Sequence, residues 1–245
     1  MAPIEWIAGT VPKIGNRAEE NEDATNASAD GLRFGIADGA TEGWESGPWA
    51  THLTAAFINA PPTPATFAGW LAETRRAWVP KAAPGPLPWY ATVKQQEGSF
   101  ATVAGLEIRR TAKPPGWGWR SVAVGDSCLL HLRGEKLLAA FPHSSPAAFG
   151  NRPRLVPSAA DVACPEPEWL AGRAAAGDLF LLATDAVAAQ LLHPHALKVA
   201  LVAVRESLRT RNPESMLAWL RTVQATTNDD ASLIGIRLPA PEEVR

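Results

Sequence analysis

Cysteine is scarce in this chain of 245 residues, which contains only Cys128 and Cys164. The two residues lie far apart and show none of the close spacings of zinc-binding cysteines. This excludes a disulfide-rich scaffold and a cysteine-based metal site. We therefore expect free thiols and a reducing compartment.

A strong charge imbalance and long apolar runs are also missing. The formal net charge is −2 and the chain has no basic block, so a nucleic-acid partner has no electrostatic support. No apolar run approaches the roughly 20 residues of a membrane span, so we expect no membrane partner. Residues 1–6 lack the basic and apolar regions of a signal peptide. These absences predict a cytoplasmic protein.

Apolar residues are plentiful, at 46% of the chain, which is enough for a substantial core. Proline-rich stretches interrupt the sequence, but strands are expected on both sides of them and are needed to complete a sheet. We therefore expect one domain over residues 1–245. Residues 142–168, rich in Pro, Ser and Ala, are expected to form an irregular surface excursion.

Strands are expected in consecutive groups, with helices between the groups. The expected strands are 32–37, 100–108, 120–124, 128–132, 137–141, 178–184 and 231–238, and the pair 120–124 and 128–132 could also be one bent strand. The expected helices are 47–59, 65–79, 186–192, 196–209 and 213–226, with a loop at 80–88. This grouping favours an α+β fold, with largely antiparallel sheets and helices on their outer faces, over a doubly wound parallel fold.

Acidic residues stand at the edges of several apolar segments. Asp38-Gly39 follows the first expected strand, and similar settings hold Glu22-Asp23, Asp185 and Asp229-Asp230. Carboxylates gathered from distant parts of a chain repel each other unless a cation holds them together. Oxygen ligands without His or Cys favour Mg²⁺ or Mn²⁺ over zinc.

Six short motifs in this order resemble those of the metal-dependent 2C-type serine/threonine protein phosphatases, in their bacterial form. They are Asn21-Glu22-Asp23, Ile36-Ala37-Asp38-Gly39, Gly98-Ser99-Phe100-Ala101-Thr102, Gly125-Asp126-Ser127, Ala183-Thr184-Asp185-Ala186 and Asp229-Asp230-Ala231-Ser232. The resemblance implies a four-layer α-β-β-α sandwich with a site at one edge. It also implies two Mn²⁺ or Mg²⁺ ions, with a third, weaker ion in some members.

The resemblance also implies roles for individual residues. Asp38 would bridge both ions and the Gly39 carbonyl would bind one of them, while Asp185 and Asp229 would bind the other. Asp23, with Glu22 beside it, would orient water, and Asp126 would help to hold the third ion.

The implied reaction is hydrolysis of phosphoserine or phosphothreonine in a phosphorylated protein, with a metal-bridging water as the nucleophile. A Ser/Thr kinase would be the partner that supplies the phosphorylated substrate.

Four positions depart from the family pattern. The phosphate-binding Arg usually stands five residues before the Asp of the first motif, but here Arg17 stands six before Asp23. Arg17 remains our expected phosphate ligand, with Lys13 or Arg33 as substitutes. Ala40 takes the place of a proton-donating His found in some members, and water would then protonate the leaving group. Ala186 replaces Gly, at a cost of about 1 kcal/mol if the position needs a positive φ. Asp230 replaces Asn, so Asp229 and Asp230 could exchange roles.

These departures leave other functions open. The chain could be a catalytically weak or inactive phosphatase-like module that binds or regulates a partner, or it could be a phosphatase of small molecules. Gly125-Asp126-Ser127 also occurs in Gly-Asp-Ser esterases. Such a Ser should open the first strand-to-helix turn, and those enzymes carry an Asp-x-x-His that this chain lacks, so the sequence argues against that class.

Overall fold

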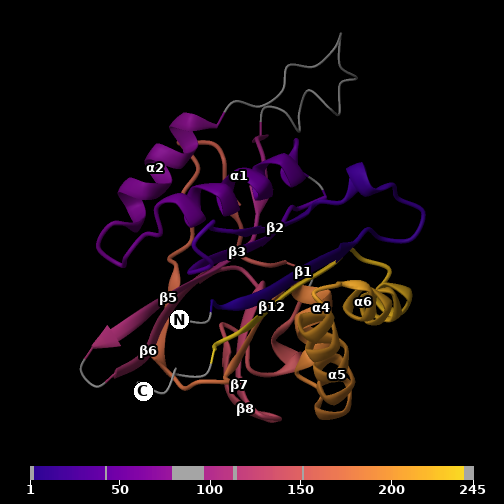
Figure 1. Ribbon diagram of the computed structural model, residues 1–245. Helices are drawn as coiled ribbons and strands as arrows, with labels where there is room; N and C mark the ends of the chain where they lie inside the picture. The colour runs from indigo at the N-terminus through magenta and orange to yellow at the C-terminus, as the bar shows by residue number, and fades with distance from the viewer. Residues whose placement is uncertain (1–2, 42, 79–96, 113–114, 151, 240–245) are drawn as a thin grey trace.

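Two five-stranded antiparallel sheets form the centre of the computed structural model, which describes residues 3–41, 43–78, 97–112, 115–150 and 152–239 (Figure 1). The first sheet has the strand order β1-β12-β11-β7-β8, and the second has the order β10-β6-β5-β3-β2. A third, short pair joins β4 to β9. The strands are β1 (Glu5–Val11), β2 (Asp23–Ala27), β3 (Arg33–Asp38), β4 (Phe100–Ala101), β5 (Val103–Ala112), β6 (Pro115–Val124), β7 (Cys128–Arg133), β8 (Lys136–Phe141), β9 (Val156–Pro157), β10 (Glu168–Ala174), β11 (Leu179–Ala183) and β12 (Ala231–Arg237).

The two sheets pack face to face across an apolar layer. Phe34 and Ile36 of β3 meet Phe180 of β11 and Ile234 of β12 in this layer. The alternate residue Ala37 of β3 instead packs against the helix on the outer face, so β3 is buried on both sides. This double burial explains why the β3 sequence is apolar at nearly every position.

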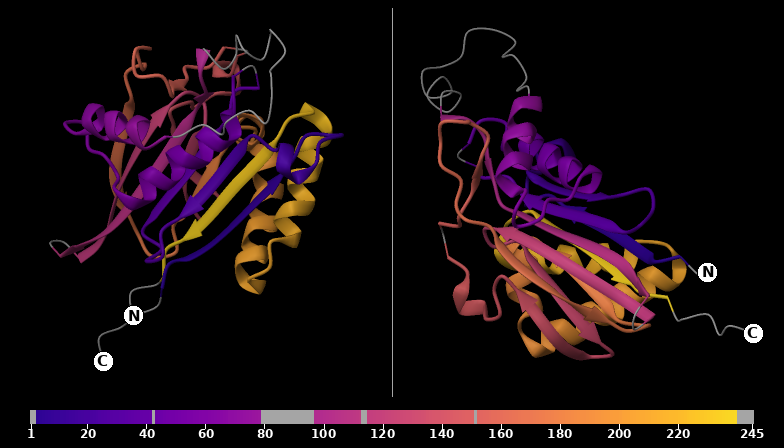
Figure 2. Two further views of the ribbon diagram at one scale, coloured as in Figure 1. Left: turned by 90° about the horizontal axis from the view of Figure 1, so that it is seen from above. Right: turned by 90° about the vertical axis from the view of Figure 1, so that its left-hand side faces the viewer.

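Helices cover both outer faces. Helices α1 (Ser46–Asn59) and α2 (Phe67–Ala77) lie on the second sheet, and α4 (Asp185–Leu191), α5 (Pro194–Thr210) and α6 (Glu214–Thr227) lie on the first (Figures 1 and 2). Two single 3₁₀ turns occur at Ala18–Glu20 and Pro146–Ala148. Three apolar clusters thus separate helix, sheet, sheet and helix layers, and the predicted α+β fold with antiparallel sheets is confirmed.

Most predicted elements are present, and their differences from the prediction are informative. The residues 120–124 and 128–132 belong to two strands, β6 and β7, and not to one bent strand. Four of the described strands were not predicted: β1, β2, β9 and β10. The stretch 142–168 is largely irregular, as expected, but contains the short strand β9. The predicted loop at 80–88 and the predicted helix end at 79 lie outside the described residues.

No single helix in the described ranges has the length and apolar content to cross a membrane. Helices α4 and α5 meet that test only when they are taken together, and they are bent by 110° at their junction.

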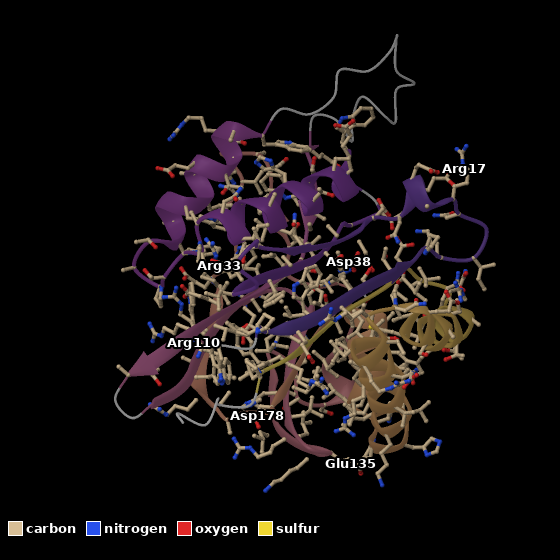
Figure 3. The ribbon with its side chains drawn as sticks, in the orientation of Figure 1. Arg17, Arg33, Asp38, Arg110, Glu135 and Asp178 are labelled. Atoms are coloured by element: carbon tan, nitrogen blue, oxygen red, sulfur yellow. The ribbon has the colours of Figure 1, made fainter. Side chains whose placement is uncertain are left out.

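A buried ionic network surrounds Asp178, at the start of β11 and away from Asp38 (Figure 3). Its carboxylate is inaccessible to solvent and accepts hydrogen bonds from Arg133 Nε and Nη2 at 2.8 and 2.9 Å, His131 Nε2 at 2.8 Å and Ala175 N at 2.8 Å. Burial acts to raise the pKa of Asp178, but the hydrogen bonds from Arg133, Ala175 and His131 outweigh it and hold the pKa below its usual value.

We expect Asp178→Asn to lower the free energy of unfolding at pH 7 by about 2 kcal/mol, because charge-assisted bonds to Arg133 are lost. A carboxyl whose pKa is lowered by folding stabilises the protein above its unfolded pKa of about 4, and this contribution disappears as pH falls through the folded pKa. The difference between wild type and variant should therefore shrink in acid. Urea unfolding at pH 7 and pH 3 measures it, with the exposed Asp161→Asn as control. An equal difference at both pH values would contradict this account.

Candidate active site

The first pair of predicted acidic residues is brought together by strand register. Strands β2 and β3 pair antiparallel with Asp23 directly opposite Asp38. Residues opposite each other in such a pair have side chains on the same face, with Cβ atoms roughly 5 Å apart. Two carboxylates that are separate in sequence therefore become neighbours at one end of the second sheet.

Three more acidic residues reach the same edge from the first sheet. β11 pairs antiparallel with β12 and β7, so Asp185 after β11 lies beside Asp229 before β12 and Asp126 before β7. The register places Ala183 of β11 opposite Cys128 of β7. The topology thus collects five carboxylates where the ends of the two sheets meet.

A cavity of about 630 Å³ opens at this edge. Asp38, Asp185 and Asp229 all line it, and so does Gly39, as the sequence led us to expect. None of the lining residues is His or Cys. The lining residues are Asp38, Gly39, Ala40, Thr41, Gly43, Glu97, Phe100, Thr102, Gly150, Arg152, Pro153, Leu155, Asp185 and Asp229.

Burial and mutual repulsion raise the pKa values of these carboxyls. Burial, followed by the charges of Asp23, Asp185, Asp229 and Asp126, raises the pKa of Asp38 well above its usual value. Burial is also the first cause of the raised pKa of Asp23, about 8, of Asp126, about 7, and of Asp185. For Asp23, whose raised pKa is about 8, a nearby cation would favour the charged carboxylate at neutral pH.

Hydroxyl groups hold the two sheets together beneath the carboxylates. Thr184 Oγ1 donates to Asp23 Oδ2 at 3.0 Å and accepts from Ser232 N at 3.1 Å. On the other side, Asp38 N donates to Thr102 Oγ1 at 3.2 Å, and Thr102 Oγ1 lies 2.7 Å from Ser127 Oγ. These hydrogen bonds therefore hold Asp23 and Asp38 in position.

Asp229 and Asp230, whose roles the sequence could not separate, have different surroundings. The exposed Asp229 lines the cavity, whereas Asp230 is 4% exposed and is turned into the protein. Asp230 Oδ1 accepts from Lys13 N at 2.7 Å and its Oδ2 accepts from Glu22 N at 2.8 Å. Asp230 thereby ties the loops that carry Lys13 and Glu22 to the start of β12.

Glu22 lies at the rim of the cavity. Its Oε2 accepts from Thr41 Oγ1 at 2.6 Å and lies 3.8 Å from Lys13 Nζ. Thr41 lines the cavity, so Lys13 and Glu22 both border it without lining it themselves.

Gly39 is required by packing as well as by chemistry. A Cβ at this position would lie 2.6 Å from the Ser46 carbonyl carbon and 2.7 Å from Gly47 N, both backbone atoms at the start of α1. Only glycine allows α1 to approach the end of β3 so closely. The close contact between the end of β3 and α1 therefore explains why a glycine follows Asp38.

The expected strain at Ala186 is absent. Among the described non-glycine residues, positive φ occurs at Glu45, Arg211 and Asn228, and Ala186 is not one of them. Helix α4 begins at Asp185, so Ala186 has ordinary helical geometry and its methyl group carries no backbone cost.

Arg17 is not brought to the cavity. It precedes the 3₁₀ turn Ala18–Glu20, its side chain is 80% exposed, and its Nε lies 3.5 Å from Glu20 Oε2. Figure 3 shows it at the periphery, pointing away from Asp38. The physical reason is the turn itself, because Glu20 also accepts the Arg17 backbone N–H at 2.7 Å and fixes the side chain outward. Arg33 is at the opposite end of β3 from Asp38, paired with Asp30 at 3.0 Å.

The basic residue that lines the cavity is Arg152, which sequence reasoning did not identify. It lies in the irregular 142–168 stretch, where no periodicity or motif marks it. Thr102 was also missed as a positioning residue, although it ends the Gly98–Thr102 motif and so carried a signal.

The donor set fits hard divalent cations. Three carboxylates face one cavity, and Asp23 Oδ1 and Asp126 Oδ1 are buried without a hydrogen-bond partner in the described part of the chain. No three described Asp, Glu, His or Cys side chains converge closely enough to form the coordination sphere of a single ion. Mg²⁺ keeps several waters and takes only one or two carboxylates, so spaced carboxylates suit hydrated ions that share ligands.

The sequence matches no family model and no curated protein. Solved structures do match. PstP, a serine/threonine phosphatase of Mycobacterium tuberculosis, aligns with a TM-score of 0.65 and 17% identity over 96% of this chain and 99% of that chain. The PstP catalytic domain in complex with two manganese ions gives 0.63 and 17%, over 96% and 98%. The serine/threonine phosphatase Stp1 of Staphylococcus aureus gives 0.63 and 13%, over 98% and 96%.

These similarities extend over nearly the whole of each chain, while the identities are low, so they establish the fold. The strand order, the helix layers and the order of the six motifs agree with that result. The chain has the fold of the bacterial 2C-type serine/threonine protein phosphatases, as the motifs predicted.

Proposed function

We propose that this chain is a phosphatase that uses Mn²⁺ or Mg²⁺ to hydrolyse phosphoserine or phosphothreonine in a phosphorylated protein. The observation that carries the proposal is the gathering of Asp38, Asp185 and Asp229 around one cavity, with buried, unpartnered carboxylate oxygens of Asp23 and Asp126 beside it. Structural neighbours that are serine/threonine phosphatases, one of them with two manganese ions, support it.

In this proposal, Asp38 and the Gly39 carbonyl would hold one cation, and Asp185 and Asp229 would hold a second one beside it. Cations bound there would neutralise charge on the phosphoryl oxygens and make nearby water more acidic. Glu22 and Asp23 orient water at the rim and base of the cavity. Asp126, whose Oδ1 has no partner among the described residues, is the proposed ligand of a third, weaker site.

Other residues at the cavity would support the reaction in different ways. Thr102 holds the backbone of Asp38, and Arg152 supplies positive charge in the cavity. Ala40, which lines the cavity, cannot donate a proton, so the leaving alkoxide takes its proton from water. A Ser/Thr kinase is the proposed source of the substrate. The free thiols Cys128 and Cys164 agree with a reducing compartment, and the cytoplasmic location stays a prediction.

Hydrolysis of an aryl phosphate tests the proposal. We expect turnover with Mn²⁺, a lower rate with Mg²⁺, and none after a chelator is added. Ca²⁺ at the same concentration serves as a control for non-specific effects of divalent ions. Turnover that survives the chelator, or no turnover at any Mn²⁺ concentration, would contradict the proposal.

The second candidate function is a phosphatase-like module that binds a partner without turnover. The outward position of Arg17 favours it, because the expected phosphate ligand is missing from the cavity. Calorimetric titration with Mn²⁺ separates the two functions when it is combined with the aryl phosphate assay. Tight Mn²⁺ binding without turnover would identify the module, and binding with turnover would identify the enzyme.

We expect Arg152→Ala to raise KM for the aryl phosphate roughly tenfold, because a charged contact to the phosphate is lost. Arg17→Ala should leave KM nearly unchanged, because its side chain is exposed and paired with Glu20. Steady-state kinetics of both variants measure this. A larger effect from Arg17→Ala would restore the sequence-based assignment and would mean that the 3₁₀ turn rearranges on binding.

A further inference from the structure

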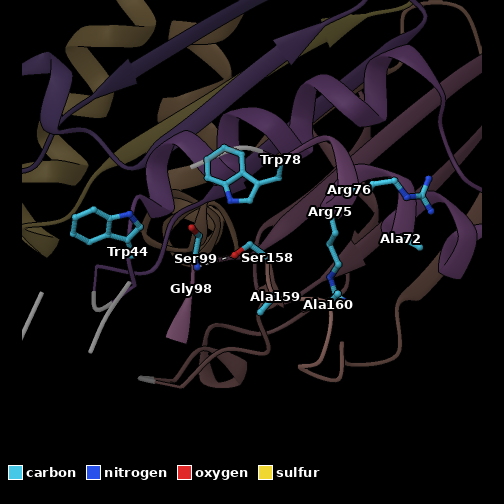
Figure 4. Close-up of a pocket in the computed structure, with 10 residues that line it drawn as sticks. All are labelled: Trp44, Ala72, Arg75, Arg76, Trp78, Gly98, Ser99, Ser158, Ala159 and Ala160. Atoms are coloured by element: carbon cyan, nitrogen blue, oxygen red, sulfur yellow. Dashed lines mark hydrogen bonds between the residues drawn. The ribbon is translucent and has the colours of Figure 1, made fainter. Parts of the chain in front are cut away.

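A second cavity has a volume of about 590 Å³, and Figure 4 shows the residues that line it. We call it the side cavity. Trp44 and Trp78 line part of it, and Arg75 and Arg76 of α2 line another part. Ser99 and Ser158 contribute hydroxyl groups. The side cavity therefore combines flat apolar faces with two guanidinium groups.

Two short stretches of backbone, at residues 43–44 and 98–100, separate the side cavity from the active-site cavity. Gly98 and Ser99 line the side cavity, while the next residue, Phe100, lines the active-site cavity. In the same way, Gly43 lines the active-site cavity and the next residue, Trp44, lines the side cavity. Trp44 N donates to Gly98 O at 3.0 Å. A polypeptide whose phosphoserine enters one cavity can therefore place a neighbouring side chain in the other.

The two arginines of the side cavity form no salt bridge within the described part of the protein. Arg75 Nε donates to Pro157 O at 2.9 Å and its Nη2 donates to Val162 O at 3.1 Å, and both acceptors are uncharged carbonyls. No described carboxylate forms an ion pair with Arg75 or the exposed Arg76. Residues 79–96, which follow α2, contain no Asp or Glu in their sequence.

The apolar wall of the side cavity is held by the core. The Trp78 ring packs against Trp49 with ring centroids 5.4 Å apart, and Trp49 is fully buried. Arg75 is similarly fixed, because its two carbonyl partners belong to the segment that contains β9. A preorganised charge on a rigid wall loses little side-chain entropy when a ligand binds.

We propose that the side cavity is a substrate subsite that binds an acidic side chain, Asp or Glu, near the phosphorylated residue of the substrate protein. This inference rests on the proposed function and names the substrate class of the same enzyme. Arg75 provides the positive charge that selects the carboxylate, and Arg76 adds positive charge at the rim of the side cavity. The indole rings of Trp44 and Trp78 cover the substrate backbone between the phosphorylated residue and the acidic residue.

Phosphopeptides test the proposal. In one series, a single Glu is moved along the positions on both sides of phosphoserine, and in a matched series Gln takes its place. We expect kcat/KM at one or two positions to be about fivefold higher with Glu than with Gln, and the preference should fade at high salt. Equal values at every position would overturn the proposal.

Two variants of Arg75 separate the effect of its positive charge from the effect of its hydrogen bonds to the carbonyls. Arg75→Gln removes the charge but keeps a donor for the carbonyls, and Arg75→Lys keeps the charge. We expect the Glu preference to fall toward unity in Arg75→Gln and in Arg76→Gln, and to survive in Arg75→Lys. The exposed Arg109→Gln is the matched control. A preference that persists in the double Gln variant would overturn the proposal.

The aryl phosphate, which has no flanking residue, shows which proposal has failed. All Arg75 and Arg76 variants should hydrolyse it at the wild-type rate. If wild type hydrolyses neither substrate, the proposed function has failed. The side cavity is then tested by fluorescence anisotropy of a labelled Glu peptide and its Gln counterpart with the wild-type chain. Tighter binding of the Glu peptide supports the subsite, and equal affinities overturn it.

Discussion

Asp38→Asn should abolish the Mn²⁺-dependent hydrolysis of an aryl phosphate, by at least about a thousandfold in kcat/KM. Asp38 is the carboxylate on which the charges of Asp23, Asp126, Asp185 and Asp229 all act. An amide has no negative charge with which to hold a cation, and the loss of several kcal/mol of charge stabilisation corresponds to about three orders of magnitude in rate.

The same substitution should raise the unfolding midpoint of the metal-free protein, because a carboxyl whose pKa is raised by folding destabilises the folded state at neutral pH and an amide does not. This opposite effect on stability shows that lost activity does not come from misfolding. Thermal unfolding in chelator provides the measurement, and Asp161→Asn, exposed and outside the cavity, is the matched control. Unchanged activity in Asp38→Asn would exclude Asp38 as a metal ligand and with it the proposed site.

Mn²⁺ should stabilise the wild-type protein strongly. A ligand at a hundred times its Kd raises the free energy of unfolding by about 2.7 kcal/mol for each independent site. For a chain of this size, each kcal/mol shifts Tm by about 2–4 °C, so one filled site corresponds to a rise of roughly 5–11 °C. The physical reason is that the cation compensates the burial and the mutual repulsion that raise the pKa values of Asp23, Asp38 and Asp126.

Differential scanning fluorimetry across a Mn²⁺ series measures this rise, and a chelator should reverse it. Asp185→Ala should reduce the gain in Tm, because a cavity-lining carboxylate is lost. The gain should disappear at low pH, where the carboxyls are protonated in the folded state and cannot bind cations. A Tm that does not depend on Mn²⁺ would leave the carboxylates without a counter-ion and would contradict the metal site.

The sequence predicted the central strands of the two sheets but missed most of the edge strands. β3 and β11 are buried on both faces, so they read as continuous or alternating apolar runs. β1, β2 and β10 are edge strands of the two sheets, and most of their residues are half-buried or exposed. An edge strand has fewer neighbours that demand apolar side chains, so periodicity alone does not reveal it.

Three acidic residues of the site were predictable because each lies next to a strong strand signal, whereas Asp23, at the start of the unpredicted β2, was identified through the family resemblance. Asp38 ends β3, Asp185 follows β11 and Asp229 precedes β12. The substrate-binding residues were not predictable in this way. Arg152 lies in an irregular stretch whose course is set by tertiary contacts, and the orientation of Arg17 depends on a short turn capped by Glu20.

The position of β12 between β1 and β11 has a consequence for the order of assembly. The last strand of the described chain is the only neighbour of β1 in its sheet, and Asp230 beside it fastens the loops that carry Lys13 and Glu22. On the ribosome, β1 must wait without a sheet partner until residues 231–237 have been synthesised. Nascent chains stalled before residue 229 should therefore bind no Mn²⁺ and should be cleaved readily near residues 5–22 by a protease. The proposed metal site would therefore be complete only once β12 has paired with β1.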